Sequence, residues 1–186
     1  LKGAIAKNPG NPALVKDLAG AYLAKGDTDK AIAKYEDALK LWGGNYVKKE
    51  YDAISSVAAL NPTLSPAQRE KLWTALWNAY PGVADAANNA GLWYRDIGKN
   101  YDESLKWYLR AADAAPADVR ILTDTGLIYH YHFNDHAKAE PFYRQAVEVA
   151  AADKRWTDLA NLLEDDMPQD HPRYGFYSRL VEKEGK

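Results

Sequence analysis

A helix–turn–helix pattern of about 34 residues recurs along this chain, and it limits the fold more than any other feature of the sequence. In its first copy, Pro12–Asn45, apolar residues follow helical spacing on both sides of a break at Gly26-Asp27. The stripes are Leu14, Val15, Leu18, Ala19 and Tyr22, then Ala31, Ile32, Tyr35, Ala38 and Leu39. Such spacing predicts two amphipathic helices joined by a tight turn. One hairpin cannot bury its apolar face alone, so we expect several to stack.

The same pattern returns in Ala84–Pro116 and again in Val119–Ala151. Both later copies carry one extra residue, which we expect in the turn between their two helices. Three copies in register predict a repeat fold that extends over nearly the whole chain.

The repeat resembles the tetratricopeptide repeat, whose pattern is W-x2-L-G-x2-Y…A-x3-F…P. The matching residues are Leu18, Ala19, Tyr22, Ala31, Tyr35 and Ala38 in the first copy, Gly91, Tyr94, Gly98, Ser104, Tyr108, Ala111 and Pro116 in the second, and Gly126, Tyr129, Ala139, Tyr143 and Ala146 in the third. Gly91 and Gly126 occupy the family's close-contact position between paired helices. The resemblance implies an all-α fold, a right-handed α-solenoid of stacked antiparallel helix hairpins.

The remaining segments fit the same organisation. Residues 46–83 read as a diverged hairpin, in which Ser65, Pro66 and Gln68 predict a capping box at the second helix. Residues 1–11 resemble the end of a preceding repeat, so we expect further repeats upstream of this sequence. The predicted segments of one continuous solenoid are 1–11, 12–45, 46–83, 84–118, 119–153 and 154–186, the last being a partial repeat with a capping helix.

Composition limits the functions that we consider. The net charge is −2, so the chain lacks the excess of basic residues that is typical of nucleic-acid-binding proteins, and we expect no nucleic-acid partner. Cysteine is absent, which excludes disulfides and thiolate metal sites. No apolar run is long enough to predict insertion into a membrane. The sequence contains no G-x-S-x-G, H-E-x-x-H, Walker or G-x-G-x-x-G motif, so we expect neither an enzyme nor a cofactor. Cytoplasmic and periplasmic locations are both compatible with these features.

Three of the four histidines gather in LIYHYHFNDHAKAE, Leu127–Glu140. We interpret His130 as a groove residue at the end of the first helix, and His132 and His136 as turn residues. The alternative is a weak metal or pH-sensitive site, in which His132 and His136 approach each other and Asp135 is a third ligand. Since structural zinc usually needs four ligands and catalytic zinc three plus water, we expect no metal.

The resemblance also implies a concave groove, lined by the first helix of each repeat, that binds a protein or peptide. Asparagine can hydrogen-bond an extended backbone as donor and acceptor, and arginine and tyrosine are enriched at binding hot spots. The predicted partner-binding residues are Lys16, Asn88, Asn89, Leu92, Arg95, Asp96, Arg120, Thr123, Asp124, Leu127, His130, Tyr131, Thr157 and Asn161.

One subfamily clamps the C-terminal carboxylate of heat-shock chaperones with lysine, asparagine and arginine from three consecutive repeats. Lys16, Asn89 and Arg120 lie at similar places, but their repeats are not consecutive. Asp124 stands where the clamp needs arginine, and an aspartate would repel a carboxylate. We therefore do not expect a chaperone-tail clamp.

The leading hypothesis is a non-enzymatic scaffold that binds a peptide or helical segment in the groove. A second is a regulatory or targeting domain of a larger protein whose catalytic part lies outside this sequence. A third is a self-assembly module that forms homo-oligomers through its solenoid ends. Upstream sequence would discriminate the second, and light scattering at several concentrations would test the third.

Overall fold

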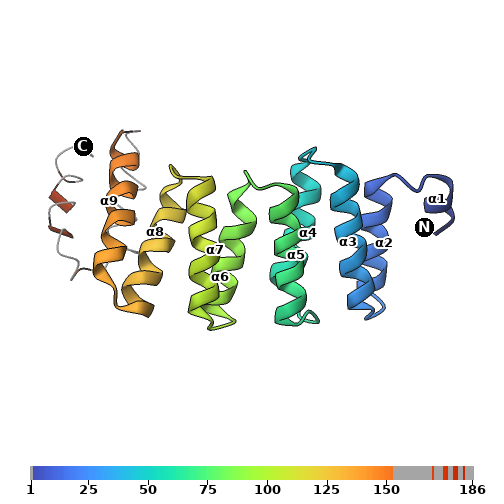
Figure 1. The fold of residues 1–186 in the computed structure, drawn as a ribbon, viewed down its shortest axis with the longest axis horizontal. Helices are drawn as coiled ribbons and strands as arrows, with labels where there is room; N and C mark the ends of the chain where they lie inside the picture. Colours follow the sequence, from blue (N-terminus) through green and yellow to red (C-terminus); the bar gives the residue numbers. More distant parts are fainter. Residues whose placement is uncertain (1, 153–168, 170–173, 176–177, 180–181, 183–186) are drawn as a thin grey trace. The chain divides into compact units, whose positions relative to one another are not determined.

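The computed structural model describes residues 2–152, together with 169, 174–175, 178–179 and 182. Every regular element among these residues is helical, so the predicted all-α class is confirmed (Figure 1). The chain forms two compact units, Leu1–Trp93 and Tyr94–Lys186. In this described part of the chain, none of the helices is both long and apolar enough to cross a membrane.

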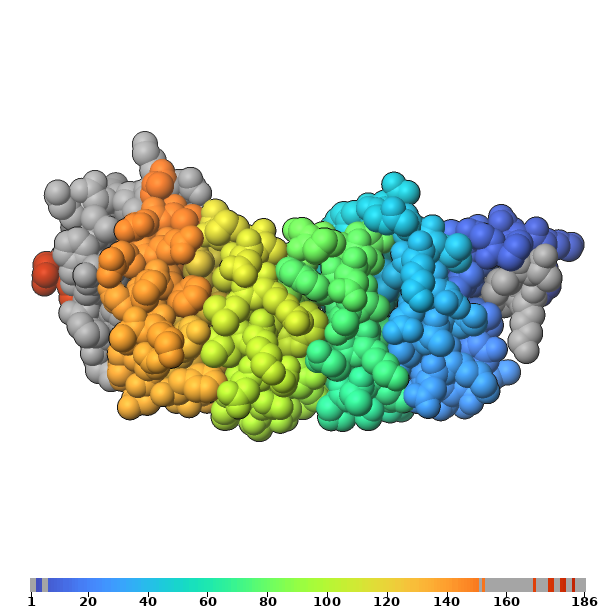
Figure 2. All heavy atoms as spheres, in the orientation of Figure 1, coloured from blue at the N-terminus to red at the C-terminus, as the bar shows by residue number. Residues whose placement is uncertain are grey.

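The first unit contains two helical hairpins after a short helix, α1 (Lys2–Lys7). One hairpin is α2 (Pro12–Leu23) with α3 (Thr28–Trp42), and the other is α4 (Lys48–Leu60) with α5 (Pro66–Ala79). The second helices α3 and α5 also contact each other, and their atoms lie on one face in Figure 2, blue and green. The pairing therefore links the hairpins of this unit through their second helices.

Local sequence sets where these helices begin. The Asn11 side chain accepts hydrogen bonds from the N–H groups of Ala13 and Leu14, at 3.0 and 3.3 Å. The predicted capping box at α5 is confirmed. The backbone N–H of Gln68 donates to Ser65 Oγ at 3.3 Å, and the backbone N–H of Ser65 donates to Gln68 Oε1 at 2.9 Å. Both bonds satisfy N–H groups that a helix start leaves unpaired.

A buried arginine closes the end of α4. Arg69, on α5, is only 6% exposed, and its guanidinium donates to the carbonyl oxygens of Ala58, Ala59 and Asn61. The guanidinium carbon also lies 5.0 Å from the ring centroid of Trp93. These carbonyls belong to the last turn of α4 and its cap, where a helix lacks internal donors. Arg69 thus supplies the hydrogen bonds that burial would otherwise leave unmade.

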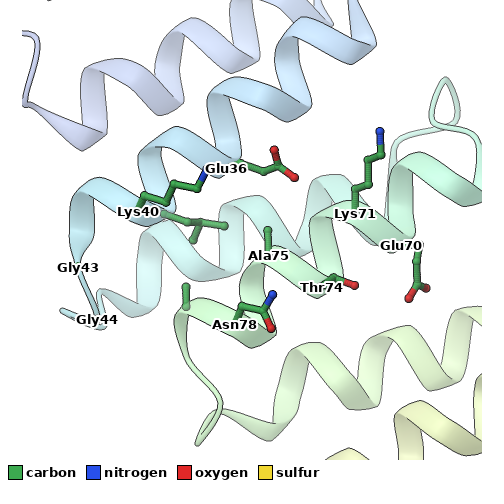
Figure 3. A pocket seen from close by; sticks show the side chains of 11 residues that line it. Glu36, Lys40, Gly43, Gly44, Glu70, Lys71, Thr74, Ala75 and Asn78 are labelled. Carbon is green, nitrogen blue, oxygen red and sulfur yellow. The ribbon is translucent and has the colours of Figure 1, made fainter.

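Between α3 and α5 lies a pocket of about 520 Å³ (Figure 3). Its apolar wall contains Leu39, Ala75 and Ala79. At one end of the pocket α3 ends at Trp42, and the next residue, Gly43, has a left-handed φ of 58° that suits a residue without a side chain. This pocket is confined to the first unit.

The second unit contains α7 (Tyr101–Ala114), α8 (Val119–Leu127), a π-helical segment η1 (Ile128–His132) and α9 (His136–Ala152). Helix α6 (Ala84–Asp96) crosses from the first unit into the second. Helix α8 contacts α7 and α9, and η1 contacts the same two helices. The second unit is therefore built around α8 and its π-helical continuation.

The extra residue of the later repeats lies in a helix and not in the turn where we expected it. Helix α2 has 12 residues and α6 has 13, while the turns that follow both are equally long. In the third copy the first helix continues through η1, whose π-helical geometry accommodates an additional residue. The hairpin geometry tolerates insertion at the helix end, because the helical bonds adjust there.

Gly126 permits close packing of α8 against α9. A Cβ atom built at Gly126 would lie 2.5 Å from Tyr143 Cε1, which is closer than real Cβ contacts. Tyr143 is fully buried in a core cluster that includes Val119, Leu122 and Ala146. The predicted reason for glycine at this position is thus visible in the contact.

Candidate functional site

The predicted binding residues of the second unit lie on α6, α8 and η1. Their exposure differs widely: Asp96, Arg120 and Tyr131 are exposed, Arg95, Asp124 and Leu127 are half-buried, and Thr123 and His130 are buried. The aromatic side chain of Tyr131 is 62% exposed. We name the residues Arg120, Asp124, Leu127 and Tyr131 the α8 stripe.

The helix itself explains this stripe. Arg120, Asp124, Leu127 and Tyr131 follow one another at intervals of three and four residues, which keeps them on one side of a helix. Asp118 caps the start of α8 by accepting a hydrogen bond from the Ile121 N–H at 3.2 Å. The stripe therefore begins directly at a fixed helix end.

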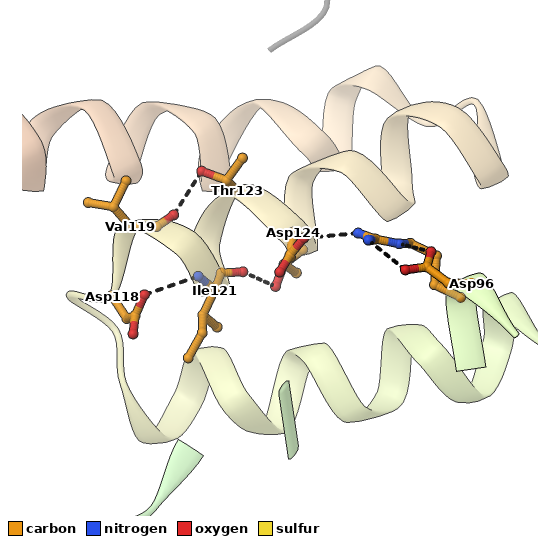
Figure 4. A network of polar contacts seen from close by, with 8 residues as sticks. Asp96, Asp118, Val119, Ile121, Thr123 and Asp124 are labelled. Atoms are coloured by element: carbon orange, nitrogen blue, oxygen red, sulfur yellow. Dashed lines mark hydrogen bonds and ion pairs between the residues drawn. The ribbon is translucent and has the colours of Figure 1, made fainter. Parts of the chain in front are cut away.

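Thr123 belongs to the interior instead of the stripe. Its side chain is 3% exposed, and its hydroxyl donates to the carbonyl oxygen of Val119 at 2.8 Å (Figure 4). Satisfying the hydroxyl within the helix lets the side chain be buried at low cost. This position offers a partner little surface.

A hydrogen bond joins Arg95 of α6 to Asp124 of α8, and Figure 4 labels Asp124 and Asp96 of this network. Arg95 Nη1 donates to Asp124 Oδ1 at 2.9 Å, and Arg95 Nε and Nη2 donate to the two carboxylate oxygens of Asp96 at 2.7 and 3.2 Å. The guanidinium carbon also lies 6.0 Å from the ring centroid of Tyr108. A fork geometry suits this double contact. These contacts hold Arg95 in place, and carboxylates of the chain itself occupy the donor groups of its guanidinium.

Charge and burial shift the pKa values around this network. Burial alone would lower the pKa of Arg95, but hydrogen bonding to Asp96 and the charges of Asp124 and Asp96 raise it above its ordinary value. The hydrogen bond from Arg95 lowers the pKa of Asp96. Both groups therefore stay charged near neutral pH. A carboxylate arriving at Arg95 would meet two existing carboxylates.

The histidines occupy three different environments. His130 is buried, and its ring lies edge-on to that of His136 with centroids 4.2 Å apart. The ring of His132 stacks on Tyr101, with centroids 3.7 Å apart. In the alternative metal or pH-sensitive site His132 would approach His136, but the ring against His136 is that of His130. Helical direction separates His130 from His132 and sends the two rings to different neighbours.

Partial burial lowers the pKa of His132, and the positive charges of Arg95 and Lys99 lower it further. Asp135 caps α9, since the Lys138 N–H donates to Asp135 Oδ1 at 3.0 Å, and it also pairs with the Lys138 ammonium at 2.8 Å. Within the described residues, no three histidine, cysteine, aspartate or glutamate side chains form a group able to hold a metal ion.

The predicted binding residues of the first unit lie on α2 and α6. Lys16 hydrogen-bonds Glu50 of α4 and lies 3.5 Å from Asp17, and the hydrogen bond to Glu50 raises its pKa against the lowering effect of burial. Asn89 donates to Ser55 Oγ at 3.3 Å. Leu92 is half-buried. These contacts tie α2 and α6 to α4.

Asn88 is fully buried, and within the described part of the chain neither the nitrogen nor the oxygen of its side-chain amide has a hydrogen-bond partner. Such a position offers a partner little surface, as at Thr123 and His130. Thr157 and Asn161, and most of the predicted partial repeat 154–186, lie outside the described residues.

Sequence reasoning took no binding residue from the diverged hairpin, residues 46–83. The structure places Glu50 and Ser55 of its first helix in contact with Lys16 and Asn89. The sequence could have indicated these two residues, because the hairpin was predicted and its first helix occupies the same place in the repeat as the helices that line the groove. They were missed because residues 46–83 match the repeat pattern only weakly.

The sequence matches two family models that are both described as tetratricopeptide repeat, over residues 1–45 and 100–155. Together these segments cover more than half of the chain. The chain belongs to the tetratricopeptide repeat family. A search of curated proteins found no match. Among solved structures, a crystal structure of MamA is similar over 83% of this chain and 86% of that chain, with 18% sequence identity and a TM-score of 0.52.

That likeness shows the fold, and it agrees with the predicted class of stacked helix hairpins. Tetratricopeptide repeats and this fold together support a protein-interaction or scaffold module. The identity of a partner depends on the exposed side chains and not on the fold.

Proposed function

We propose that this tetratricopeptide repeat chain binds a peptide or helical segment of another protein, and that the α8 stripe is part of the binding surface. The observation that carries the proposal is the exposure of Arg120 and Tyr131 at the two ends of the stripe. Arginine and tyrosine supply much of the binding energy in protein interfaces. Between them lie the half-buried Asp124 and Leu127.

The spacing of the stripe suits a short segment. Tyr131 lies eleven positions after Arg120, which corresponds to roughly 16 Å of helix. About five residues of an extended peptide span that length. Arg120 Nη2 lies 3.5 Å from Asp118 Oδ2 of the chain itself. We expect the partner to place a polar group beside Arg120 and an apolar side chain against Leu127 and Tyr131. Lys16, Asn89 and Leu92 remain proposed contacts of the first unit.

A capture experiment with matched variants tests the proposal. The chain with Arg120→Ala and Tyr131→Ala is compared with a control carrying Arg144→Ala and Glu148→Ala, which changes exposed residues of α9. Circular dichroism first establishes that both are folded. A specific partner is retained by the parent and by the α9 control and lost by the stripe variant.

The captured protein is then purified and titrated by calorimetry. Each stripe substitution alone is expected to weaken binding about tenfold, which corresponds to about 1.4 kcal/mol. If the partner binds the stripe variant and the parent with equal affinity, the α8 stripe is not the binding surface. Arg95 is left unchanged throughout because its loss would also disturb Asp124 and Asp96.

A further inference from the structure

The pocket between α3 and α5 is large enough to hold a small molecule. Its volume of about 520 Å³ falls within the range of roughly 300–1,000 Å³ that is typical of ligand sites. Leu39 of α3 and Ala75 and Ala79 of α5 give it an apolar wall. Polar and charged side chains, among them Glu36, Lys40, Lys71, Thr74 and Asn78, surround this wall (Figure 3). An apolar wall with a polar border suits an amphipathic ligand.

The border carries charged and amide side chains that do not pair with other side chains of the first unit. Within the described residues, Glu36, Lys40, Lys71 and Asn78 form neither a hydrogen bond nor an ion pair with another side chain. Elsewhere in this unit Lys34 pairs with Asp37 at 2.7 Å, so the helix surface does permit such pairs. Unpaired groups around a pocket can serve a bound molecule.

The formal charges of the lining cancel, since Glu36 and Glu70 balance Lys40 and Lys71. Their arrangement is uneven, however. Figure 3 shows the Lys40 side chain extending toward Glu36, away from Gly43 and Gly44. The end of the pocket at Gly43, Gly44 and Asn78 is therefore left without a cationic side chain from its own lining.

Two helix ends give that part of the pocket a negative potential. Helix α3 ends at Trp42 and α5 at Ala79, both next to the pocket residues Gly43, Gly44 and Asn78. Each helix C-terminus acts as about −0.5 of an elementary charge. Backbone N–H groups cap the carbonyls of Lys40 and Trp42 at 3.1 and 3.0 Å, so the field of the helices and the oxygen of the Asn78 amide act on this end of the pocket.

We propose that this pocket binds a small amphipathic amine. The aliphatic part lies against Leu39, Ala75 and Ala79, and the ammonium group lies at the end formed by Gly43, Gly44 and Asn78. A free alkylamine and the lysine side chain of another protein share this chemistry. The proposal concerns the first unit and is independent of the α8 stripe.

The first test titrates the isotope-labelled full chain with n-hexylamine and follows the backbone amide signals of Gly43 and Gly44 by nuclear magnetic resonance. 1-Hexanol and hexanoate serve as neutral and anionic controls of the same length. We expect saturable shifts with hexylamine, at least threefold weaker binding of hexanol, and the weakest binding of hexanoate. Equal affinity for all three, or no saturable shift, would overturn the proposal.

Two variants locate the ammonium and the aliphatic part. Asn78→Lys places a cation at the end that we assign to the ammonium, at an exposed position where it leaves the core intact. It should weaken hexylamine at least fivefold and leave hexanol unchanged, whereas Asn78→Gln keeps the amide and should bind like the parent. Ala75→Phe fills the pocket and should abolish binding. Unchanged hexylamine affinity in Asn78→Lys would overturn the assignment of the ammonium.

N-acetyl-lysine methylamide then separates the two sources of the amine. Affinity equal to that of hexylamine assigns the pocket to the lysine of a partner protein, because the backbone atoms must fit at the entrance. Affinity at least tenfold weaker assigns it to a free alkylamine. If the lysine analogue binds but Asn78→Lys does not weaken it, the ammonium lies elsewhere and the proposal fails.

Discussion

At the scale of single residues, protonation of His132 makes the stability of the protein depend on pH. Its ring stacks on Tyr101, and partial burial together with Arg95 and Lys99 lowers its pKa below the ordinary value of 6.5. In the unfolded chain that surrounding is lost, so the unfolded state binds the proton more readily below pH 6.5. The stabilising contribution is therefore present above pH 6.5 and is lost as the pH falls toward the lower pKa of the folded state.

We expect the free energy of unfolding to fall as the pH is lowered from 7.5 to 5.5, and to fall less steeply in His132→Gln. Urea unfolding at several pH values measures both slopes. Because Arg95 and Lys99 act through charge, added salt should reduce the difference between the two proteins. Parallel slopes would show that His132 does not cause the pH dependence.

Some residue-scale features follow from the sequence and others do not. The capping residues Ser65 and Gln68 act locally, so their spacing alone was sufficient. Arg69 looks like an ordinary charged residue of a helix, and only the arrangement of α4 and α5 reveals that it satisfies three carbonyl oxygens. The same limit explains Asn88, Thr123 and His130, since a spacing rule gives the side of a helix but not the depth of burial.

At the scale of elements, replacing two helical glycines by alanine should change the stability of the protein in opposite directions. Gly126 of α8 faces Tyr143 of α9, so a methyl group there would overlap the ring. Gly20 of α2 has open space, because its nearest contact would be Tyr35 Oη at 3.9 Å. Gly126→Ala should destabilise the protein by about 1–3 kcal/mol through overpacking. Gly20→Ala should stabilise it by about 0.5–1 kcal/mol, because alanine favours helix.

Chemical denaturation of both variants checks this pair. A second test combines Gly126→Ala with Tyr143→Leu, which removes the ring from the contact. The double variant should lose less stability than the sum of the two single changes, because the overlap is relieved. Strict additivity would mean that the Gly126–Tyr143 contact does not explain the glycine.

The helices themselves could be predicted from apolar spacing, because each hairpin repeats the same local pattern. The π-helical η1 could not. Its sequence signal was the one extra residue, and sequence alone does not distinguish a longer turn from a wider helical turn. Contacts of η1 with α7 and α9 decide between them in the folded protein.

At the scale of the whole molecule, α6 is the element that both units contain. Its Asn89 contacts Ser55 in the first unit, and its Arg95 contacts Asp124 in the second. The family models match residues 1–45 and 100–155, whereas the partner depends on exposed residues that repeat patterns do not specify. The α8 stripe is thus a proposal about side chains placed on a known kind of fold.

Leu92→Pro should break α6 between these two contacts, at a cost of about 3 kcal/mol. We expect amide hydrogen exchange to accelerate in α4 and in α8, because each loses a contact to α6. Leu92→Ala is the control, since it shortens the side chain and keeps the helix. Acceleration confined to one of the two helices would show that α6 does not couple their stability.

The shared helix also restricts how the gene can be rearranged. A crossover between related genes at the codons between Asn89 and Arg95 would join half of one helix to half of another, although Asn89 would stay with Ser55 and Arg95 with Asp124. A crossover in the preceding turn would keep α6 whole but would separate Asn89 from Ser55. Chimaeras that receive α6 intact with the second unit should therefore also need a serine at position 55 of the first unit.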